Sequence, residues 1–238
     1  MIRAVLFDYG NTLVDFYRRE EFPEILARAV TRAAQALGEG SRLPPDLWAR
    51  VKQEDKERQD LRVRPLEGRL SRIFRTSDPD RLESACRAFT EVIVEGARTR
   101  PGSAEVLAAL RDRGLSLGLI SNSPWGAPAR YWREDLCLRG LQDLLDMDLF
   151  CRDVGLRKHS PVIFRRALEI MGLGPEEAVF VGDDPRWDVM GPLAVGMKAV
   201  LLDPHRSHSH RPSVRRLADL LTLPPFGGRG PREAGPAG

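Results

Sequence analysis

The 238-residue sequence predicts an α/β fold, with a doubly wound, Rossmann-like parallel sheet and an inserted all-helical segment. Two patterns support this prediction. From residue 100 to about 222, short apolar runs alternate with amphipathic helical stretches, which is typical of a parallel sheet covered by helices on both faces. Residues 15–99 show only helical periodicity. We therefore expect a core formed by residues 1–14 and 100–222, a helical insert over 15–99, and a disordered tail over the Pro/Gly-rich residues 223–238.

The chain begins with a short apolar run, residues 2–7, which predicts a strand buried on both faces of the sheet. One carboxylate, Asp8, follows this run directly, and Gly10, Asn11 and Thr12 come next. Ligands of open parallel sheets bind outside the carboxyl ends of the strands. This position is therefore a candidate for binding or chemistry.

The insert is expected to contain several helices. Apolar residues recur at helical spacing from residue 25 to 37, and Gly38 ends that run. The stretch 44–61 begins with two prolines and has the mixed charges of a solvated helix. A further helix is expected after Asp78, an N-cap candidate that is followed by Pro79.

The alternation begins after a Pro-Gly turn that ends the insert. In this part of the chain the expected strands are shorter and more uniformly apolar than the expected helices, as in a parallel sheet. Strands are expected at 115–121, 147–151, 177–182 and 197–202, and helices at 103–114, 127–140, 160–172, 185–196 and 213–221.

Composition limits the possible partners and location of the protein. The balance of 37 Lys and Arg against 34 Asp and Glu gives a net charge of only +3, which predicts no nucleic-acid or membrane partner. No apolar run is long enough to span a bilayer, and the N-terminus has no signal-peptide pattern. The three cysteines are widely spaced, which favours reduced thiols and a cytoplasmic protein. The sequence does not predict an oligomeric state.

Polar residues follow several of the expected strands. They are Asp8, Ser121, Asn122, Lys158, Asp183 and Asp184. The carboxyl ends of parallel strands share one edge of the sheet, so these side chains are expected to lie close together. Carboxylate oxygens suit Mg²⁺, which keeps several waters and bridges to phosphate oxygens. Lys158 and Ser121 would then neutralise and hold a phosphoryl group.

Four motifs in this order resemble those of the haloacid dehalogenase superfamily, whose members are mostly phosphohydrolases. The family's DxDxT corresponds to Asp8-Tyr9-Gly10-Asn11-Thr12, its Ser or Thr followed by Asn to Ser121, its Lys to Lys158 in GLRKHSPVIF, and its GDxxxxD to Asp183 and Asp188 in VGDDPRWDV. Each motif alone is a weak signal, but four in order on suitable elements are a strong one. The resemblance covers residue 1 to about 203, and the insert resembles the family's cap domain.

The resemblance implies a role for each matched residue. Asp8 would be the nucleophile that forms an aspartyl-phosphate, and Lys158 would be its catalytic partner. The Mg²⁺ site would consist of Asp8, the Gly10 carbonyl and Asp183, with Asp188 steadying it from behind. Phosphate would be bound by Asn11, Thr12, Ser121, Asn122 and Lys158. The implied substrate is a small phosphorylated metabolite.

The sequence departs from the family's phosphatases at Gly10, where they carry a second Asp as general acid and base. Positioned proton transfer contributes about 10²–10⁴-fold, or roughly 3–5 kcal/mol of barrier. Three interpretations follow: a phosphatase that is slow or selective for good leaving groups, a different chemistry, or a binding or regulatory protein that has lost activity. Some sugar-phosphate phosphatases of the family also begin with DxGN, so phosphatase remains the leading hypothesis.

The different chemistry could be a phosphonate C–P hydrolysis, which in this family uses a cap lysine as a Schiff base. Lys52 and Lys56 are the lysines of the insert, but their charge-rich surroundings predict a solvated helix face. Dehalogenation is disfavoured because its enzymes lack the acidic fourth motif, which Asp183 and Asp184 supply here.

Other residues are weaker candidates. His159 stands where the family usually has Pro and could replace the missing acid. His205, His208 and His210 could form a metal-binding tract, although a solvated loop is favoured. Trp125 and Trp132 flank the second motif and could line a cleft, although packing is the commoner role of such residues.

Overall fold

The computed structural model describes residues 1–39, 43–56, 60–224 and 226. Its centre is a six-stranded sheet in the order β5-β4-β1-β6-β7-β8, in which every pair of neighbouring strands is parallel. The α/β fold class is thus confirmed. The strands are β1 (Ala4–Phe7), β4 (Ser116–Ser121), β5 (Met147–Phe150), β6 (Ala178–Gly182), β7 (Lys198–Leu202) and β8 (Ser213–Val214).

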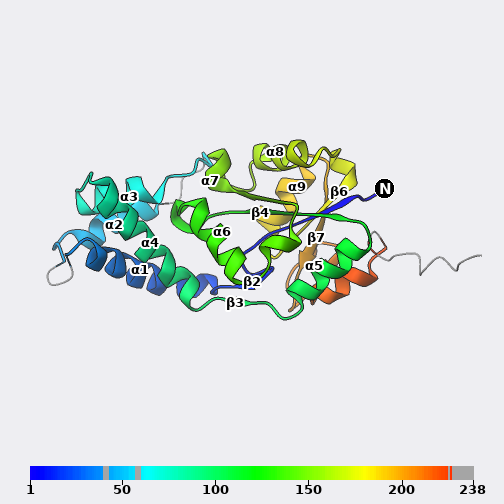
Figure 1. The fold of residues 1–238 in the computed structure, drawn as a ribbon, viewed down its shortest axis with the longest axis horizontal. Coiled ribbons are helices and arrows are strands. Elements are labelled where there is room, and N and C mark those ends of the chain that lie inside the picture. Colours follow the sequence, from blue (N-terminus) through cyan, green and yellow to red (C-terminus); the bar gives the residue numbers. More distant parts are fainter. Residues whose placement is uncertain (40–42, 57–59, 225, 227–238) are drawn as a thin grey trace, which may run out of the picture.

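β1 is apolar at every position because helices cover both faces of the sheet. Val5 and Phe7 belong to the larger hydrophobic cluster, whereas Leu6 belongs to the cluster beneath α8 (Pro161–Met171). In Figure 1, α8 lies on one side of the sheet and α5 (Ser103–Asp112) on the other. The remaining helices around the sheet are α6 (Ala129–Leu138), α7 (Cys151–Val154) and α9 (Gly191–Leu193).

The strand order places a topological switch at β1. The chain passes from β1 to β4 and β5 on one side, and then crosses to β6 and β7 on the other. Ligand sites of doubly wound sheets lie at the carboxyl ends of the strands beside such a switch. The ends of β1, β4 and β6 are therefore where the polar residues of the motifs converge.

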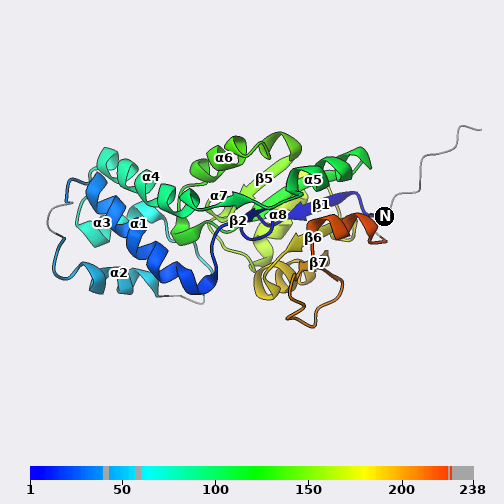
Figure 2. The same cartoon turned by 90° about the horizontal axis from the view of Figure 1, so that it is seen from below.

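The insert consists of helices that lie beside one end of the sheet (Figures 1 and 2). α1 and α4 pack along each other through their apolar faces, and Asp78 caps α4 by accepting the amides of Asp80 and Arg81. This N-cap was expected from the sequence. The helices are α1 (Phe22–Ala36), α2 (Leu47–Asp55), α3 (Leu66–Phe74) and α4 (Pro79–Glu95).

The margins of the insert differ from the all-helical expectation. Asp15 lies in β2 (Val14–Asp15), which pairs antiparallel with β3 (Arg98–Thr99). The two chain segments that join the insert to the sheet therefore run side by side. Two-residue strands carry too little periodicity to be recognised in a sequence.

Three other expectations need correction near the C-terminus. Ser213–Val214 form β8 rather than the start of a helix, and a 3₁₀ helix, η6, follows at Leu217–Thr222. The expected helix at 185–196 is a π-helix, η5 (Pro185–Met190), followed by α9. The expected disorder does not hold for Phe226, which is buried in the larger hydrophobic cluster. The other residues from 225 onwards lie outside the described residues.

The insert also meets the sheet region at a second place. The Val63 amide donates to the Gly155 carbonyl at 2.9 Å, and the Arg157 amide donates to the Leu61 carbonyl at 2.8 Å. These bonds pair the insert with the loop that leads to Lys158. No helix among the described residues is long and apolar enough to cross a membrane.

Trp125 and Gly126, which follow β4, extend this second contact. The Trp125 indole N–H donates to Asp55 of the insert at 2.8 Å, and its ring stacks on Phe89 with 5.5 Å between centroids. Trp125 therefore has the packing role that the sequence favoured. Gly126 has φ +72°, and a Cβ atom there would collide with the Arg64 carbonyl oxygen.

We predict that Gly126→Ala destabilises the protein more than Gly140→Ala. Both glycines have positive φ, where alanine costs roughly 1–2 kcal/mol, but nothing lies near a Cβ at Gly140. The collision with Arg64 adds roughly 1–3 kcal/mol to the cost at Gly126. Urea unfolding of both variants measures the difference, and equal losses of stability would show that the insert does not press on Gly126.

Candidate active site

The side chain of Lys158 joins two carboxylates at the carboxyl edge of the sheet. Its Nζ lies 2.5 Å from Oδ1 of Asp8 and 2.7 Å from Oδ1 of Asp188, and only 2% of Lys158 is exposed. Asp8 follows β1 directly, and its amide donates to the Val181 carbonyl of β6 at 2.8 Å. The sheet therefore fixes the backbone of Asp8, while the lysine fixes its carboxylate.

Asp188 also holds the loop after β6. Its Oδ2 accepts the amides of Asp183 and Asp184, each at 3.1 Å. Asp184 caps η5 by accepting two amides of that helix, which is the capping role suggested by the sequence. Gly182 makes this packing possible, because a Cβ atom at this position would overlap the Asp188 carboxyl group.

The buried cluster has more negative than positive charge. Oxygens of Asp8, Asp183 and Asp188 lie within 4.8 Å of one another, and the ammonium of Lys158 contacts two of them, Asp8 and Asp188. Burial and the charges of Asp188 and Asp8 raise the pKa of Asp183 to about 8. Burial likewise raises the pKa of Asp188 to about 7, although Lys158 opposes that shift. Burial disfavours the ammonium of Lys158, but the two carboxylates raise its pKa above the usual value.

This excess of buried negative charge fits a divalent cation, since a cation would let all three carboxylates ionise. Both oxygens of Asp188 already accept hydrogen bonds, so Asp8 and Asp183 offer the more available carboxylates. Among the described residues, no hydrogen bond reaches the carbonyl oxygen of Gly10. These three groups together are the oxygen donors that Mg²⁺ prefers.

The expected phosphate-binding residues fall into two groups. Thr12 and Ser121 are buried, with Thr12 Oγ1 3.5 Å from Asp183 and Ser121 Oγ 3.3 Å from the Asn122 carbonyl. The two asparagines are already engaged within the protein. Asn122 Oδ1 accepts the Lys158 amide at 2.9 Å, which positions the lysine.

Asn11 shapes the segment that enters the insert. It has φ +56°, its Nδ2 donates to the Tyr17 carbonyl, and its Oδ1 accepts the Phe16 amide. Its own amide donates to the Val14 carbonyl. Asn tolerates the left-handed conformation better than most residues, and both its backbone amide and its side chain make hydrogen bonds within this turn.

The backbone of Gly10 does not require glycine. Its φ lies outside the left-handed region, and a Cβ atom would make ordinary contact with Phe16, at 3.6 Å. Phe16 packs edge-on against Tyr9 and Trp132, with ring centroids 5.4 and 6.0 Å away. The position therefore has a hydrophobic neighbour and room for the first carbon of a side chain.

One network near the site could not be found from the sequence. The Tyr9 hydroxyl donates to Oδ2 of Asp135 at 2.5 Å, and Arg139 Nε donates to the same oxygen at 2.9 Å. Burial, followed by the charge of Asp135, raises the pKa of Tyr9 above its usual value. The network fixes the residue after Asp8 to α6. In the sequence, Asp135 and Arg139 resemble an ordinary i,i+4 surface pair.

The weaker candidates lie in several places. His159 packs against Trp187, with ring centroids 5.3 Å apart. His210 Nε2 lies 3.3 Å from the Ala199 carbonyl oxygen of β7. His205 and His208 line a cleft that also contains Asp183. Lys52 and Lys56 are exposed, and Lys56 donates to Gln53 beside it.

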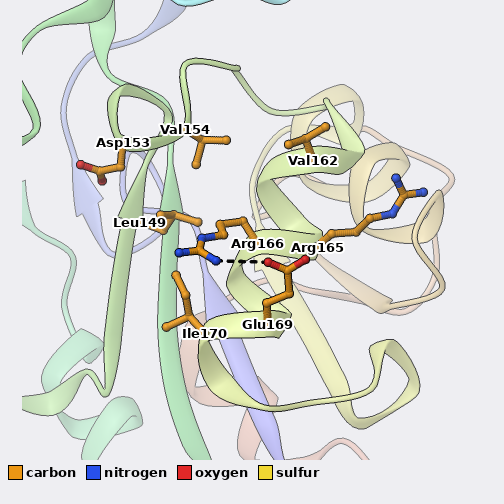
Figure 3. A pocket seen from close by; sticks show the side chains of 8 residues that line it. All are labelled: Leu149, Asp153, Val154, Val162, Arg165, Arg166, Glu169 and Ile170. Atoms are coloured by element: carbon orange, nitrogen blue, oxygen red, sulfur yellow. Dashed lines mark hydrogen bonds and ion pairs between the residues drawn. The ribbon is translucent and has the colours of Figure 1, made fainter.

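The cleft beside Asp183 has a volume of about 500 Å³, with Asn11 and Asp183 in its wall. A second hollow of about 390 Å³ lies on α8 and α7 (Figure 3), where Arg166 pairs with Glu169. Neither the candidate nucleophile Asp8 nor Ser121, Lys158, Asp183 or Asp188 lines that second hollow. The cleft beside Asp183 is therefore the better candidate for a substrate site.

The sequence of this chain is similar to those of known hydrolases. A family model described as haloacid dehalogenase-like hydrolase matches residues 2–196. The glyceraldehyde 3-phosphate phosphatase of Methanopyrus kandleri is 29% identical, over 84% of this chain and 83% of the relative. The phosphoserine phosphatase of Thermus thermophilus is 33% identical, over 84% of this chain and 81% of the relative.

Solved structures give the same result. A HAD phosphatase from Thermococcus onnurineus has a TM-score of 0.59, and a 2-haloacid dehalogenase from Pseudomonas syringae has 0.65. Each is 25% identical and aligns with 93% of this chain and 97% of its own. With a family model matching most of its length and an acidic, lysine-bearing site at the expected sheet edge, this chain belongs to the haloacid dehalogenase-like hydrolase family.

Proposed function

We propose that this protein is a magnesium-dependent phosphohydrolase that acts on a small phosphorylated metabolite through an aspartyl-phosphate on Asp8. The observation that supports this most strongly is the buried Lys158 between Asp8 and Asp188, with Asp183 beside them. A nucleophilic carboxylate needs to be held in place and partly neutralised before it can attack an anionic phosphoryl group. Lys158 does both.

The chain's own residues would act in two steps. Lys158 holds Oδ1 of Asp8, and the other oxygen attacks phosphorus as the bond to the leaving oxygen breaks. Water then attacks phosphorus, which releases phosphate and restores the Asp8 carboxylate. Buried hydroxyls of Thr12 and Ser121 would donate to the phosphoryl oxygens. Mg²⁺, held by Asp8, the Gly10 carbonyl and Asp183, would supply positive charge to the phosphoryl group.

The size of the substrate follows from the cleft and the relatives. A volume of about 500 Å³ is in the range of small-molecule sites. Similar proteins include phosphatases of glyceraldehyde 3-phosphate, phosphoserine and phosphoglycolate. We propose a substrate of this class, a cytoplasmic location, and no nucleic-acid or membrane partner.

The other interpretations have less support. A Schiff-base lysine for phosphonate hydrolysis has to be desolvated to react, but both Lys52 and Lys56 are exposed. Dehalogenation is disfavoured by the buried acidic cluster that includes Asp183. The remaining alternative is not an enzyme but a binding or regulatory protein that has lost activity. Activity assays on phosphate esters distinguish it from a phosphatase.

We predict that Asp8→Asn lowers turnover of p-nitrophenyl phosphate and acetyl phosphate on the order of 10³-fold or more, because an amide cannot serve as the nucleophile. Circular dichroism should show an unchanged fold. Asp143→Asn, at an exposed position, is the matched control and should retain full activity. Wild-type turnover by Asp8→Asn would rule out the covalent mechanism.

We predict that activity requires magnesium at millimolar order and is lost in excess chelator. Asp183→Asn should raise the magnesium concentration needed for half-maximal activity by about 10-fold to 100-fold, because one ligand loses its charge. Titration of activity with magnesium measures this shift. Full activity in excess chelator would remove the metal from the mechanism.

We predict a steep dependence of the rate on leaving-group pKa, because Gly10 supplies no general acid. Acyl and aryl phosphates, whose leaving groups need little protonation, should react far faster than alkyl phosphates. The aspartyl-phosphate should also accumulate, since nothing at Gly10 activates water. A series of phosphate esters, measured in single-turnover and steady-state assays, provides the slope.

Gly10→Asp should speed alkyl phosphate hydrolysis by at most about 10²–10⁴-fold, the contribution of positioned proton transfer. A smaller gain is expected because Phe16 packs beside this position. If single-turnover rates of wild type are equal for alkyl and aryl esters, another group supplies the proton, and our view of Gly10 is wrong.

A further inference from the structure

We propose that His205 and His208 form a second anion-binding subsite in the cleft beside Asp183. This subsite would recognise a carboxylate or a second phosphate carried by the leaving group of the substrate. The inference rests on the proposed phosphohydrolase function and specifies the class of phosphate ester that the enzyme prefers.

The loop that carries the two histidines has a defined conformation. Asp203 is only 4% exposed and accepts the Ser207 amide and hydroxyl at 3.0 Å and the His208 amide at 2.9 Å. The Asp203 amide donates to the Val214 carbonyl of β8, and Arg215 donates to the Pro204 carbonyl. The start and the end of the turn are therefore both tied to the sheet region, which reduces the entropy cost of binding a ligand there.

This loop forms one wall of the cleft. It follows β7, and in Figure 2 it protrudes from the edge of the sheet. His205 and His208 line the cleft on this side, and Tyr17 and Arg18 line it on the side of the insert. Asp183 lies in the same cleft. Asp183 belongs to the same carboxylate cluster as the nucleophile Asp8. The leaving group of an ester bound at Asp8 would therefore extend past Asp183 into the space that the histidines border.

Most charged groups of the cleft are already paired. Arg18 lies 2.8 Å from Glu21, and Arg100 lies 2.5 Å from Asp15. These two pairs are neutral, so neither arginine carries an unpaired charge for the substrate, and the other carboxylates of the cleft are Asp183, a ligand of the proposed Mg²⁺, and Asp203. Asp203 is satisfied by the hydrogen bonds of its own loop.

The two imidazoles are among the groups of the cleft with remaining hydrogen-bonding capacity, together with the hydroxyl of Tyr17. Among the described residues, no hydrogen bond to His205 is found, and His208 uses only Nδ1, 3.4 Å from Ser207 Oγ and 3.6 Å from Asp203. Imidazole N–H groups bind charged acceptors more strongly than neutral ones. A carboxylate or phosphate is the acceptor-rich group that fits two such donors.

The histidines do not form a metal site of their own. His210, the third histidine of the stretch, contacts the Ala199 carbonyl of β7 instead. Among the described residues, the one group of side chains placed to hold a metal is that of Asp8, Asp183 and Asp188. The His-rich stretch thus divides into two residues in the cleft and one outside it, and the outer one provides a control.

Calorimetry with three phosphate esters of similar length tests the subsite without requiring turnover. The ligands are 2-phosphoglycolate, ethane-1,2-diol bisphosphate and 2-hydroxyethyl phosphate, which carry a carboxylate, a second phosphate and a neutral hydroxyl. They are titrated into Asp8→Asn, which retains the cleft, in the presence of magnesium. We expect at least one of the two ligands with an anionic tail to bind about 10-fold to 100-fold more tightly than the hydroxyl ligand.

The double substitution His205→Gln and His208→Gln in the same background should reduce that preference to about 2-fold or less. His210→Gln should leave it unchanged. The ligand whose advantage is lost identifies the tail as carboxylate or phosphate. Equal binding of all three ligands to the parent protein, or a preference that survives the double substitution, would overturn the inference.

Kinetics separate this inference from the proposed function. With Asp8 intact, the double variant should hydrolyse phenyl phosphate, which has no anionic tail, at the wild-type kcat/KM. Its KM for the preferred tailed ester should rise about 10-fold or more at similar kcat. If wild type hydrolyses no ester at all, the phosphohydrolase proposal fails, while the binding comparison still decides whether the subsite exists.

Discussion

The arrangement of the site depends on one buried ion pair network, in which the ammonium of Lys158 lies between Asp8 and Asp188. Breaking a buried ion pair leaves an unpaired charge in the protein interior, which is strongly unfavourable. Because Asp188 also accepts the amides of Asp183 and Asp184, the network extends from the end of β1 to the loop after β6. The lysine thus sets the position of both acidic motifs at once.

The same network explains why the site suits charged ligands. Three clustered carboxylates, two of them buried, are not electrically balanced by one ammonium, as the raised pKa of Asp183 indicates. A cation and a phosphoryl group together would complete the balance. Two surrounding contacts would hold the backbone in place while the cation and the phosphoryl group bind and leave. They join Tyr9 to Asp135 and Asn122 to the Lys158 amide. Rigid support of this kind is what preorganised electrostatic catalysis requires.

Much of this arrangement could be predicted from the sequence, because strand ends and motif spacing are local features. Asp8, Lys158 and Asp183 each follow an apolar run, and parallel strands bring such ends together. The bond between Tyr9 and Asp135 could not be predicted, since it depends on where α6 packs. Short strands such as β8 (Ser213–Val214) were equally hidden, because pairing with β7, and not periodicity, defines them.

Two glycines of the site differ in how freely evolution can replace them. Gly182 cannot be replaced without disturbing the site. Any side chain there would displace the Asp188 carboxyl group and so disrupt the ion pairs of Lys158. Gly10 can be replaced, because its backbone is unstrained and an added Cβ atom would make only ordinary contact with Phe16. A lineage carrying this fold could therefore gain or lose an acid at residue 10 by a single substitution without dismantling the nucleophile. The range of phosphate esters that such a protein hydrolyses can therefore change during evolution while its fold stays the same.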